Sequence, residues 1–188
     1  MTELLAPTPV ASAAVAAPQP RSLLRLQSGG QVLAVPIEAV REILEVGRLT
    51  PLPRTPSFVR GVMNLRGAVV PVVDLSARLE HGVSPIERRT CIVVVEVAAD
   101  VEDDAGDEDH YGRTLVVGLL VDAVYEVFDT DDSQIEPVPM LGTRVRADFL
   151  AGMTRARGQV IGVLNLPRVL SAVDLASLIA SHQPARAA

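Results

Sequence analysis

The chain has 188 residues, of which 48% are hydrophobic and only 3% aromatic, so a sizeable core can be built mainly from Val, Leu and Ile. The formal net charge is −6 and all 17 basic residues are arginine, which excludes a phosphate-loop lysine, a Schiff base and a lysine general base. Cys91 is the single cysteine, which excludes an intrachain disulfide and is consistent with a reducing compartment.

Residues 1–20 are rich in Ala and Pro, which favours a disordered leader. Ala14–Ala16 resembles a signal-peptidase site, but the segment has no basic n-region and contains Glu3. Pro7 and Pro9 also interrupt its apolar stretch. We therefore expect a cytoplasmic chain, and no apolar run reaches the roughly 18–20 residues needed for membrane insertion.

Residues 21–180 are expected to form the ordered domain, followed by a flexible tail over residues 181–188. Short Val-rich runs separated by Gly and Pro predict a mainly β fold, because branched side chains suit a pleated surface. Short helical turns are expected at residues 36–40 and 75–79. The strands are expected at 23–26, 32–35, 40–46, 62–65, 68–73, 90–97 and 115–121.

A strongly acidic stretch separates the two strongest predicted strands. Seven of the 23 acidic residues lie within residues 100–109, and without them 16 acids face 17 arginines. Like charges repel one another, so this stretch is expected to be a solvated loop. The near-neutral remainder offers no broad basic surface, which argues against nucleic acid as a partner.

An internal repeat is the most informative feature of the chain, and residues 36–79 and 120–170 carry it. The order of five motifs is kept and only the loops between them change length. Each half is therefore expected to be a small unit of about five short strands, in a barrel or a sandwich. The paired motifs are VREI and VYEV, PLP and PVP, FVRGV and FLAGM, RG and RG, and PVVDL and GVLNL.

The residue pattern predicts no enzyme and no cofactor. The three histidines are scattered and, with one cysteine, make no zinc spacing, and the acidic stretch has Ala105 where an EF-hand loop needs glycine. Asp74 and Asp122 end or interrupt apolar strands, where capping of a turn by Asp is commoner than catalysis. No catalytic residues and no metal site are therefore predicted.

Several of these motifs resemble the CheW family of chemotaxis adaptor proteins over about residues 21–179. The resemblance is carried by VPIEAVREI, LPRTPSFVRGVMNLRGAVVPVVDL, VVGLLVDAVYEV, IEPVP and FLAGM. It implies two intertwined five-stranded SH3-like β-barrels with short connecting helices and a C-terminal helix. It also implies a non-enzymatic adaptor that couples chemoreceptors to a CheA-type histidine kinase in membrane-associated arrays.

The resemblance also implies two kinds of contact residue. One set would bind the cytoplasmic tip of a methyl-accepting chemoreceptor, and the other would contact the kinase regulatory domain or ring neighbours at the barrel ends. The kinase or ring positions are Ile37, Met140 and Leu141. The receptor-binding positions are Val40, Glu42, Gly61, Asn64, Arg66, Val124 and Val127.

Each of these residues also has a structural interpretation that the sequence leaves open. Arg66 can simply form a tight hairpin turn with Gly67. Val40, Val124 and Val127 can be core residues. Glu42 matches Glu126 in the repeat, which allows a shared structural role. Gly61 likewise has a counterpart in the repeat, which suggests positive φ or a bulge.

Two other adaptor assignments stay open at this point. One is a CheW-like adaptor of a non-flagellar pathway, such as pilus or surface sensing. The other is a regulator of the CheV type, which carries an attached receiver domain, and no second domain fits after residue 180.

Overall fold

The computed structural model describes residues 20–98, 114–139 and 144–171. These residues form ten strands, three 3₁₀ turns and two short α-helices. The acidic stretch, Met140, Leu141 and the tail over 181–188 lie outside the described residues, as does nearly all of the expected leader. The last described helix is α2 (Leu166–Val169), and a further C-terminal helix would also fall outside them.

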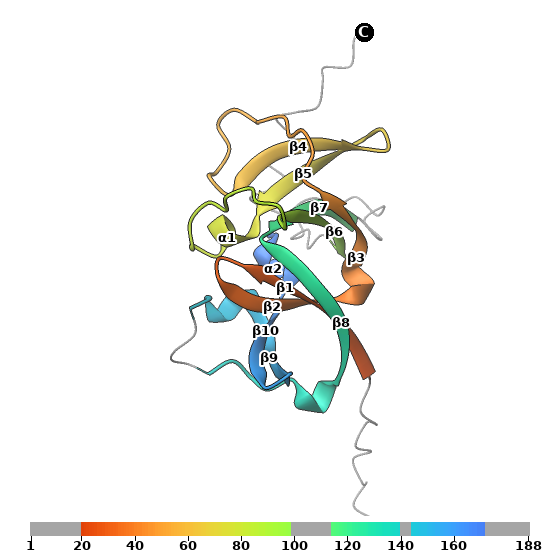
Figure 1. Cartoon of the computed structure of the whole chain (residues 1–188), viewed down its shortest axis with the longest axis vertical. Helices are drawn as coiled ribbons and strands as arrows, with labels where there is room; N and C mark the ends of the chain where they lie inside the picture. The colour runs from red at the N-terminus through yellow and green to blue at the C-terminus, as the bar shows by residue number, and fades with distance from the viewer. Residues whose placement is uncertain (1–19, 99–113, 140–143, 172–188) are drawn as a thin grey trace, which may run out of the picture.

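The strands are arranged in two five-stranded sheets, which confirms the mainly β prediction (Figure 1). Sheet A has the order β8-β1-β2-β10-β9 and sheet B has the order β3-β6-β7-β5-β4. Sheet A comprises β1 (Pro20–Ser28), β2 (Gln31–Pro36), β8 (Ala123–Asp131), β9 (Leu150–Ala156) and β10 (Gln159–Leu164). Sheet B comprises β3 (Val40–Glu45), β4 (Val59–Leu65), β5 (Ala68–Asp74), β6 (Cys91–Ala98) and β7 (Thr114–Val121).

The sheet orders explain the internal repeat. Strands β3, β6, β7, β5 and β4 hold in sheet B the places that β8, β1, β2, β10 and β9 hold in sheet A. Strands β1 and β2 come from the first half of the chain but join β8, β9 and β10 from the second half. The two halves therefore exchange their first two strands, and this confirms that the units are intertwined.

The sheets are curved as in SH3-like barrels, but no continuous ladder of backbone hydrogen bonds joins the two edge strands of either sheet in the described residues. In sheet B the chain that follows β3 reaches the opposite edge at one bridge, where Thr50 and Val62 exchange two backbone hydrogen bonds of 2.8 and 2.9 Å. Glu136 and Met153 make the same exchange in sheet A at 2.7 and 2.8 Å. Isolated bridges at equivalent places thus complete both units.

Strand β5 shows how the sequence decides burial. It lies between β7 and β4, and its residues from Val70 to Asp74 are all buried. Val73 packs in the cluster between the sheets, whereas Val72 packs in the interior of sheet B. Because alternate side chains point to opposite faces, an almost wholly apolar run is expected when both faces are covered.

Three apolar clusters form the core. A central cluster lies between the two sheets and includes Leu24 and Leu26 from sheet A and Val93 and Val95 from sheet B. Each sheet also has a smaller interior cluster of its own. That of sheet A contains Leu23, Ala34, Ile161 and Val163, and that of sheet B contains Val72, Ile92, Val94 and Leu120.

Arg78 joins the two halves where their short helices meet. It ends α1 (Leu75–Arg78), and its guanidinium carbon lies 4.8 Å from the ring centre of Phe58 and 5.0 Å from that of Phe149. These two rings are counterparts in the repeat. Arg78 Nε also donates a 2.7 Å hydrogen bond to the carbonyl of Val169. A cation between two rings adds an attractive contact to the apolar packing.

Within the residues that the structure describes, none of the helices is long and apolar enough to cross a membrane.

Candidate functional site

The predicted receptor-binding residues lie on three strands and one turn. Gly61 and Asn64 are in β4, and Arg66 is in the turn between β4 and β5. Strand β3 carries Val40 and Glu42, and strand β8 carries Val124 and Val127. Strands β3 and β8 are the counterpart edge strands of the two sheets, and both lie on the right-hand side of Figure 1.

The β4–β5 turn is built around Arg66 and Gly67, which have φ angles of 53° and 90°. Two successive residues with positive φ are typical of a type I′ hairpin, which fits the twist of the flanking strands. Asn64 Oδ1 accepts a 2.9 Å hydrogen bond from the Gly67 amide and holds the turn. Asn64 therefore has a structural task, and Arg66 occupies the tight hairpin that the sequence allows.

The turn also presents the guanidinium of Arg66 to solvent. The Arg66 side chain is 80% exposed, and its Nη2 lies 3.1 Å from Oε2 of Glu42, whose side chain is 24% exposed. The fold thus brings together two residues that the sequence places 24 positions apart. A guanidinium has five N–H donors, and the hydrogen bond described for Arg66 uses one of them. Exposed ion pairs also contribute little to stability, so the contact with Glu42 can be exchanged for a contact with a partner.

The second half repeats this ion pair with one difference. Arg157 has a φ of 50° in the β9–β10 turn and contacts Glu126, just as Arg66 contacts Glu42. Glu126 is also held by Arg25 Nη1 at 2.9 Å. Two arginines therefore neutralise Glu126, whereas among the described ion pairs Glu42 has Arg66 alone.

The valines of the predicted set divide into two groups. Val40 and Val124 are half-buried and pack against the central cluster, as the core interpretation expects. Val127 is 50% exposed on the outer face of β8. Its counterpart in β3 is Ile43, which is 45% exposed. The sequence analysis missed Ile43, although the same repeat offset that relates Glu42 to Glu126 relates it to Val127.

Ile37 belongs to the 3₁₀ turn η1 (Ile37–Ala39), is half-buried and packs against the central cluster. The two other predicted kinase or ring positions lie outside the described residues. The structure therefore places one member of that set, close to the junction between the sheets.

Gly61 has a backbone role of its own. Its φ is 129°, and a β-carbon there would lie 2.2 Å from the carbonyl oxygen of Thr50. Gly152, its counterpart, has an ordinary φ, but a β-carbon there would lie 2.9 Å from the carbonyl oxygen of Glu136. Both glycines allow the close approach that makes the two isolated bridges.

We expect Gly61→Ala to destabilise the fold by about 2 kcal/mol or more, because it adds a backbone clash to an unfavourable φ. Chemical denaturation would measure the free energy of unfolding. Gly47→Ala is the matched control, since nothing lies within 4 Å of a β-carbon there. Equal stability of the two variants would show that Gly61 is not needed for the bridge to Thr50.

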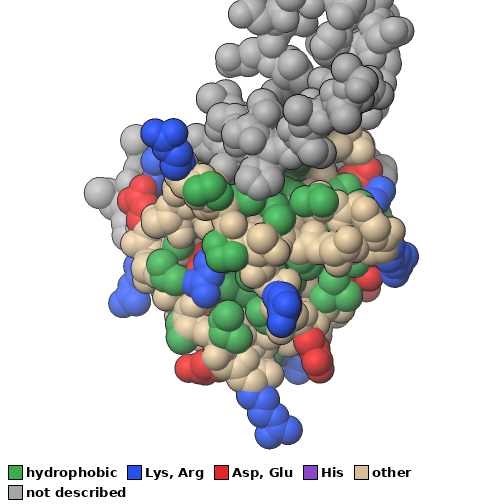
Figure 2. Space-filling model, turned by 90° about the horizontal axis from the view of Figure 1, so that it is seen from above, with side chains coloured by type: hydrophobic (Ala, Val, Ile, Leu, Met, Phe, Trp, Pro, Cys, Tyr) green, Lys and Arg blue, Asp and Glu red, His purple; other side chains and the backbone are tan. Residues whose placement is uncertain are grey.

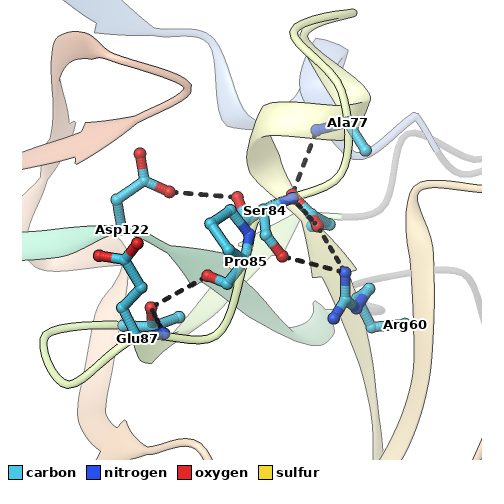
Figure 3. A network of polar contacts seen from close by, with 8 residues as sticks. Arg60, Ala77, Ser84, Pro85, Glu87 and Asp122 are labelled. Carbon is cyan, nitrogen blue, oxygen red and sulfur yellow. Dashed lines mark hydrogen bonds and ion pairs between the residues drawn. The ribbon is translucent and has the colours of Figure 1, made fainter.

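Asp74 is a buried cap. It is fully buried, and its Oδ1 accepts a 3.1 Å hydrogen bond from the amide of Ala77 at the start of α1 (Figure 3). Its Oδ2 accepts from the amide of Ser84 at 2.9 Å and lies 3.2 Å from Nη1 of Arg60. Asp122 accepts from the Ser84 hydroxyl at 3.1 Å. Asp74 thus caps α1, in agreement with the capping interpretation, whereas Asp122 contacts a hydroxyl 38 positions away in the sequence.

The face of the molecule that is seen from above carries charges of both signs (Figure 2). Figure 2 shows hydrophobic side chains interspersed with arginines and acidic side chains on the face seen from above. Across the described residues there is no group of three or more His, Cys, Asp or Glu side chains that could hold a metal ion. The described arrangement is suited to contacts with another protein, through isolated apolar side chains and arginine donors.

Comparisons with known proteins agree on one family. Residues 22–174 match the CheW-like domain. The chain is 36% identical to a chemotaxis protein CheW of Rhizobium meliloti, over 79% of this chain and 86% of that one. It is also 36% identical to protein FrzA of Myxococcus xanthus, over 73% of this chain and 78% of that one.

A solved structure supports the same assignment. The crystal structure of the scaffolding protein TtCheW from Thermoanaerobacter tengcongensis matches with a TM-score of 0.65 and 27% identity. The match covers 82% of this chain and 90% of that one. The sheets, the repeat and these matches together place the chain in the CheW family of scaffold and adaptor proteins.

Proposed function

We propose that this chain is a non-enzymatic adaptor that couples chemoreceptors to a CheA-type histidine kinase in membrane-associated arrays. The observation that carries the proposal is the corner made by Arg66 and Glu42, where a tight turn holds an exposed guanidinium beside one carboxylate. Membership of a scaffold family supports an adaptor role. The receptor, the kinase and the location in arrays are the proposed part.

The receptor contact is proposed at this corner and along the neighbouring strand. Arg66 would exchange its 3.1 Å contact with Glu42 for carboxylates or carbonyls of the receptor tip. Val127, which is 50% exposed on β8, is proposed as a second contact point for the receptor. Its counterpart Ile43 is 45% exposed on β3, on the face opposite to Glu42, because successive side chains of a strand alternate. Arginine is one of the residues that contribute most to binding at protein interfaces.

The remaining receptor-binding residues have supporting tasks in this proposal. Asn64 holds the turn through its 2.9 Å hydrogen bond to Gly67. Gly61 allows the bridge to Thr50 that fixes the edge strand β4. Val40 and Val124 would take part through their half-exposed surfaces. The kinase regulatory domain is proposed to contact Ile37, Met140 and Leu141.

A two-bait pull-down tests the proposal. The purified chain would be incubated with the receptor cytoplasmic tip and the kinase regulatory domain from the same organism, each immobilised separately. We expect both baits to retain the chain, and the kinase that retains it best would also identify the pathway. If neither bait retains the folded chain above an unrelated SH3-like domain, the proposed function is wrong.

We also expect the purified chain neither to hydrolyse ATP nor to become phosphorylated by it. No lysine is available for a nucleotide phosphate, and Asp74 and Asp122 are both held by hydrogen bonds in the fold. The measurement is incubation with γ-labelled ATP, followed by detection of labelled protein and free phosphate. Stoichiometric label on the chain would contradict this expectation.

A further inference from the structure

Strand β8 has a bulge opposite β1. The register between the two strands shifts between Leu24 and Leu26. Arg25 is the single residue between them, and it lies opposite both Tyr125 and Glu126. Bulges re-aim side chains and are common at sheet edges and beside functional sites. This bulge brings the side chains of Tyr125 and Glu126 together against the guanidinium of Arg25.

Three arginines surround these two side chains of β8. Arg25 Nη1 lies 2.9 Å from Oε1 of Glu126, and its guanidinium carbon lies 4.7 Å from the ring centre of Tyr125. Arg157 Nη2 contacts the other carboxylate oxygen of Glu126. The guanidinium carbon of Arg89, which precedes β6, lies 5.2 Å from the ring centre of Tyr125. All of these residues except Arg89 line a hollow of about 290 Å³, which we call the β8 hollow.

The counterpart place in sheet B is electrically balanced. Strand β3 has a bulge of its own, between Val40 and Glu42. Beside it, Arg41 Nε lies 2.6 Å from Oε2 of Glu96. Arg66 Nη2 lies 3.1 Å from Oε2 of Glu42. Two arginines thus face two carboxylates, and no net charge remains at this place.

Replacements between the halves make the β8 hollow positive. The counterpart of Arg25 is Val94, which is fully buried and carries no charge. The ion pair between β3 and β6 is replaced by a hydrogen bond from the Tyr125 hydroxyl to Gln27 Oε1. With Arg89 added, three arginines and one glutamate meet at the hollow, although the chain as a whole has a net charge of −6.

The partial burial of Arg25 favours a further anion. Its side chain is 16% exposed, and among the described residues its buried Nε has no hydrogen-bond partner. The carboxylate of Glu126 is shared between Arg25 and Arg157. A partly buried cation attracts a carboxylate more strongly than an exposed one does, because the surrounding protein screens charge less than water. A second carboxylate in the hollow would therefore be attracted by all three arginines.

We infer that the β8 hollow binds an acidic side chain of a partner protein. Arg157 is the main donor, since its side chain is 72% exposed and its ion pair with Glu126 uses one of its three nitrogen atoms. A guanidinium can hold a carboxylate by two parallel hydrogen bonds, and arginine and tyrosine are enriched at protein interfaces. The partner is thus a protein segment with an exposed aspartate or glutamate. The hollow lies in sheet A, whereas the corner proposed for the receptor lies in sheet B.

Titration of the isotope-labelled full-length chain with an acidic peptide tests the inference. The probe is a short acetylated peptide of glutamates, and the same peptide made of glutamines is its control. Nuclear magnetic resonance would follow the side-chain N–H signals of the arginines and the backbone amide of Tyr125. We expect saturable shifts at Arg89, Arg157 and Tyr125 with the glutamate peptide and none with the glutamine peptide.

A matched pair of variants locates the site. Arg157→Gln keeps most of the side chain but removes its charge, and it is expected to weaken binding of the glutamate peptide about tenfold, the value of one charge-assisted hydrogen bond. Arg155→Gln changes the net charge by the same amount on the same hairpin. Because Arg155 is exposed on the face of β9 opposite to the buried Thr154, this variant is expected to keep the affinity.

Gln27→Glu gives a readout that leaves every arginine in place. It supplies the carboxylate that the counterpart Glu96 has in sheet B, with nearly the same shape as glutamine. One added negative charge beside the hollow is expected to weaken binding of the glutamate peptide about threefold. The difference should fade at high salt, because exposed charges are screened.

Four outcomes would overturn the inference. The first is no saturable binding of the glutamate peptide, and the second is equal saturation by the glutamine peptide. The third is an equal loss of affinity in the Arg155 and Arg157 variants, and the fourth is an unchanged affinity in the Gln27 variant. None of these readouts involves the receptor or the kinase, so the proposed function can fail without affecting this result.

Discussion

Replacing Arg66 with alanine is expected to weaken binding to the receptor tip by about thirtyfold or more. Truncation of an arginine at the centre of an interface typically costs about 2 kcal/mol or more of binding free energy. The free energy of unfolding should change by no more than about 0.5 kcal/mol, because the side chain is exposed and its ion pair with Glu42 is near the surface. Titration calorimetry and chemical denaturation would measure the two effects separately.

Arg157→Ala is the internal control for that experiment. Arg157 occupies the same kind of turn, with the same positive φ, and contacts the equivalent carboxylate of Glu126. Its removal leaves Glu126 paired with Arg25. Equal loss of receptor affinity in the two variants, or unfolding of the Arg66 variant, would show that Arg66 acts only in the hairpin. Kinase binding should survive in both variants.

Asp74→Ala is expected to destabilise the fold by about 3 kcal/mol. It removes the cap of α1, worth about 1 kcal/mol, and leaves the buried amide of Ser84 without its acceptor. It also leaves Arg60 without its ion pair in a partly buried position. The measurement is the free energy of unfolding from chemical denaturation.

Asn165→Ala measures the loss of a helix cap without the loss of the buried contacts that Asp74 makes with Ser84 and Arg60. The hydrogen bond described for the Asn165 side chain is the cap itself, in which Oδ1 accepts from the amide of Arg168 at 3.3 Å. Its loss is therefore expected to cost about 1 kcal/mol. If the Asp74 and Asn165 variants lose the same stability, the buried contacts to Ser84 and Arg60 contribute nothing.

Local patterns predicted strands β1 to β7, whereas β8, β9 and β10 were expected only through the internal repeat. The apolar run at 68–73 and the Gly29–Gly30 turn between β1 and β2 are both found in the structure. The repeat also showed which residues are counterparts, including Glu42 and Glu126. The exchange of strands between the halves was not evident from residue patterns alone. Those patterns favour short strands but do not specify partners from distant parts of the chain.

The contacts of the candidate site required the structure. The spacing of Arg66 and Glu42 gives no reason to expect an ion pair, because they meet only when β3 and the β4–β5 turn are placed by the sheet. Asp74 was expected to cap a turn, and it does. Its contacts to Ser84 and Arg60 join three separate elements, so local pattern could not reveal them.

The most direct test of the coupling role is the activity of the kinase. Receptor in membrane vesicles would be mixed with its CheA-type kinase, with and without this chain, and kinase autophosphorylation would be followed over time. The proposed role predicts that receptor control of the kinase appears only when the chain is present, and that Arg66→Ala abolishes it while Arg157→Ala does not. Full receptor control without the chain, or no change on adding it, would contradict the proposed function.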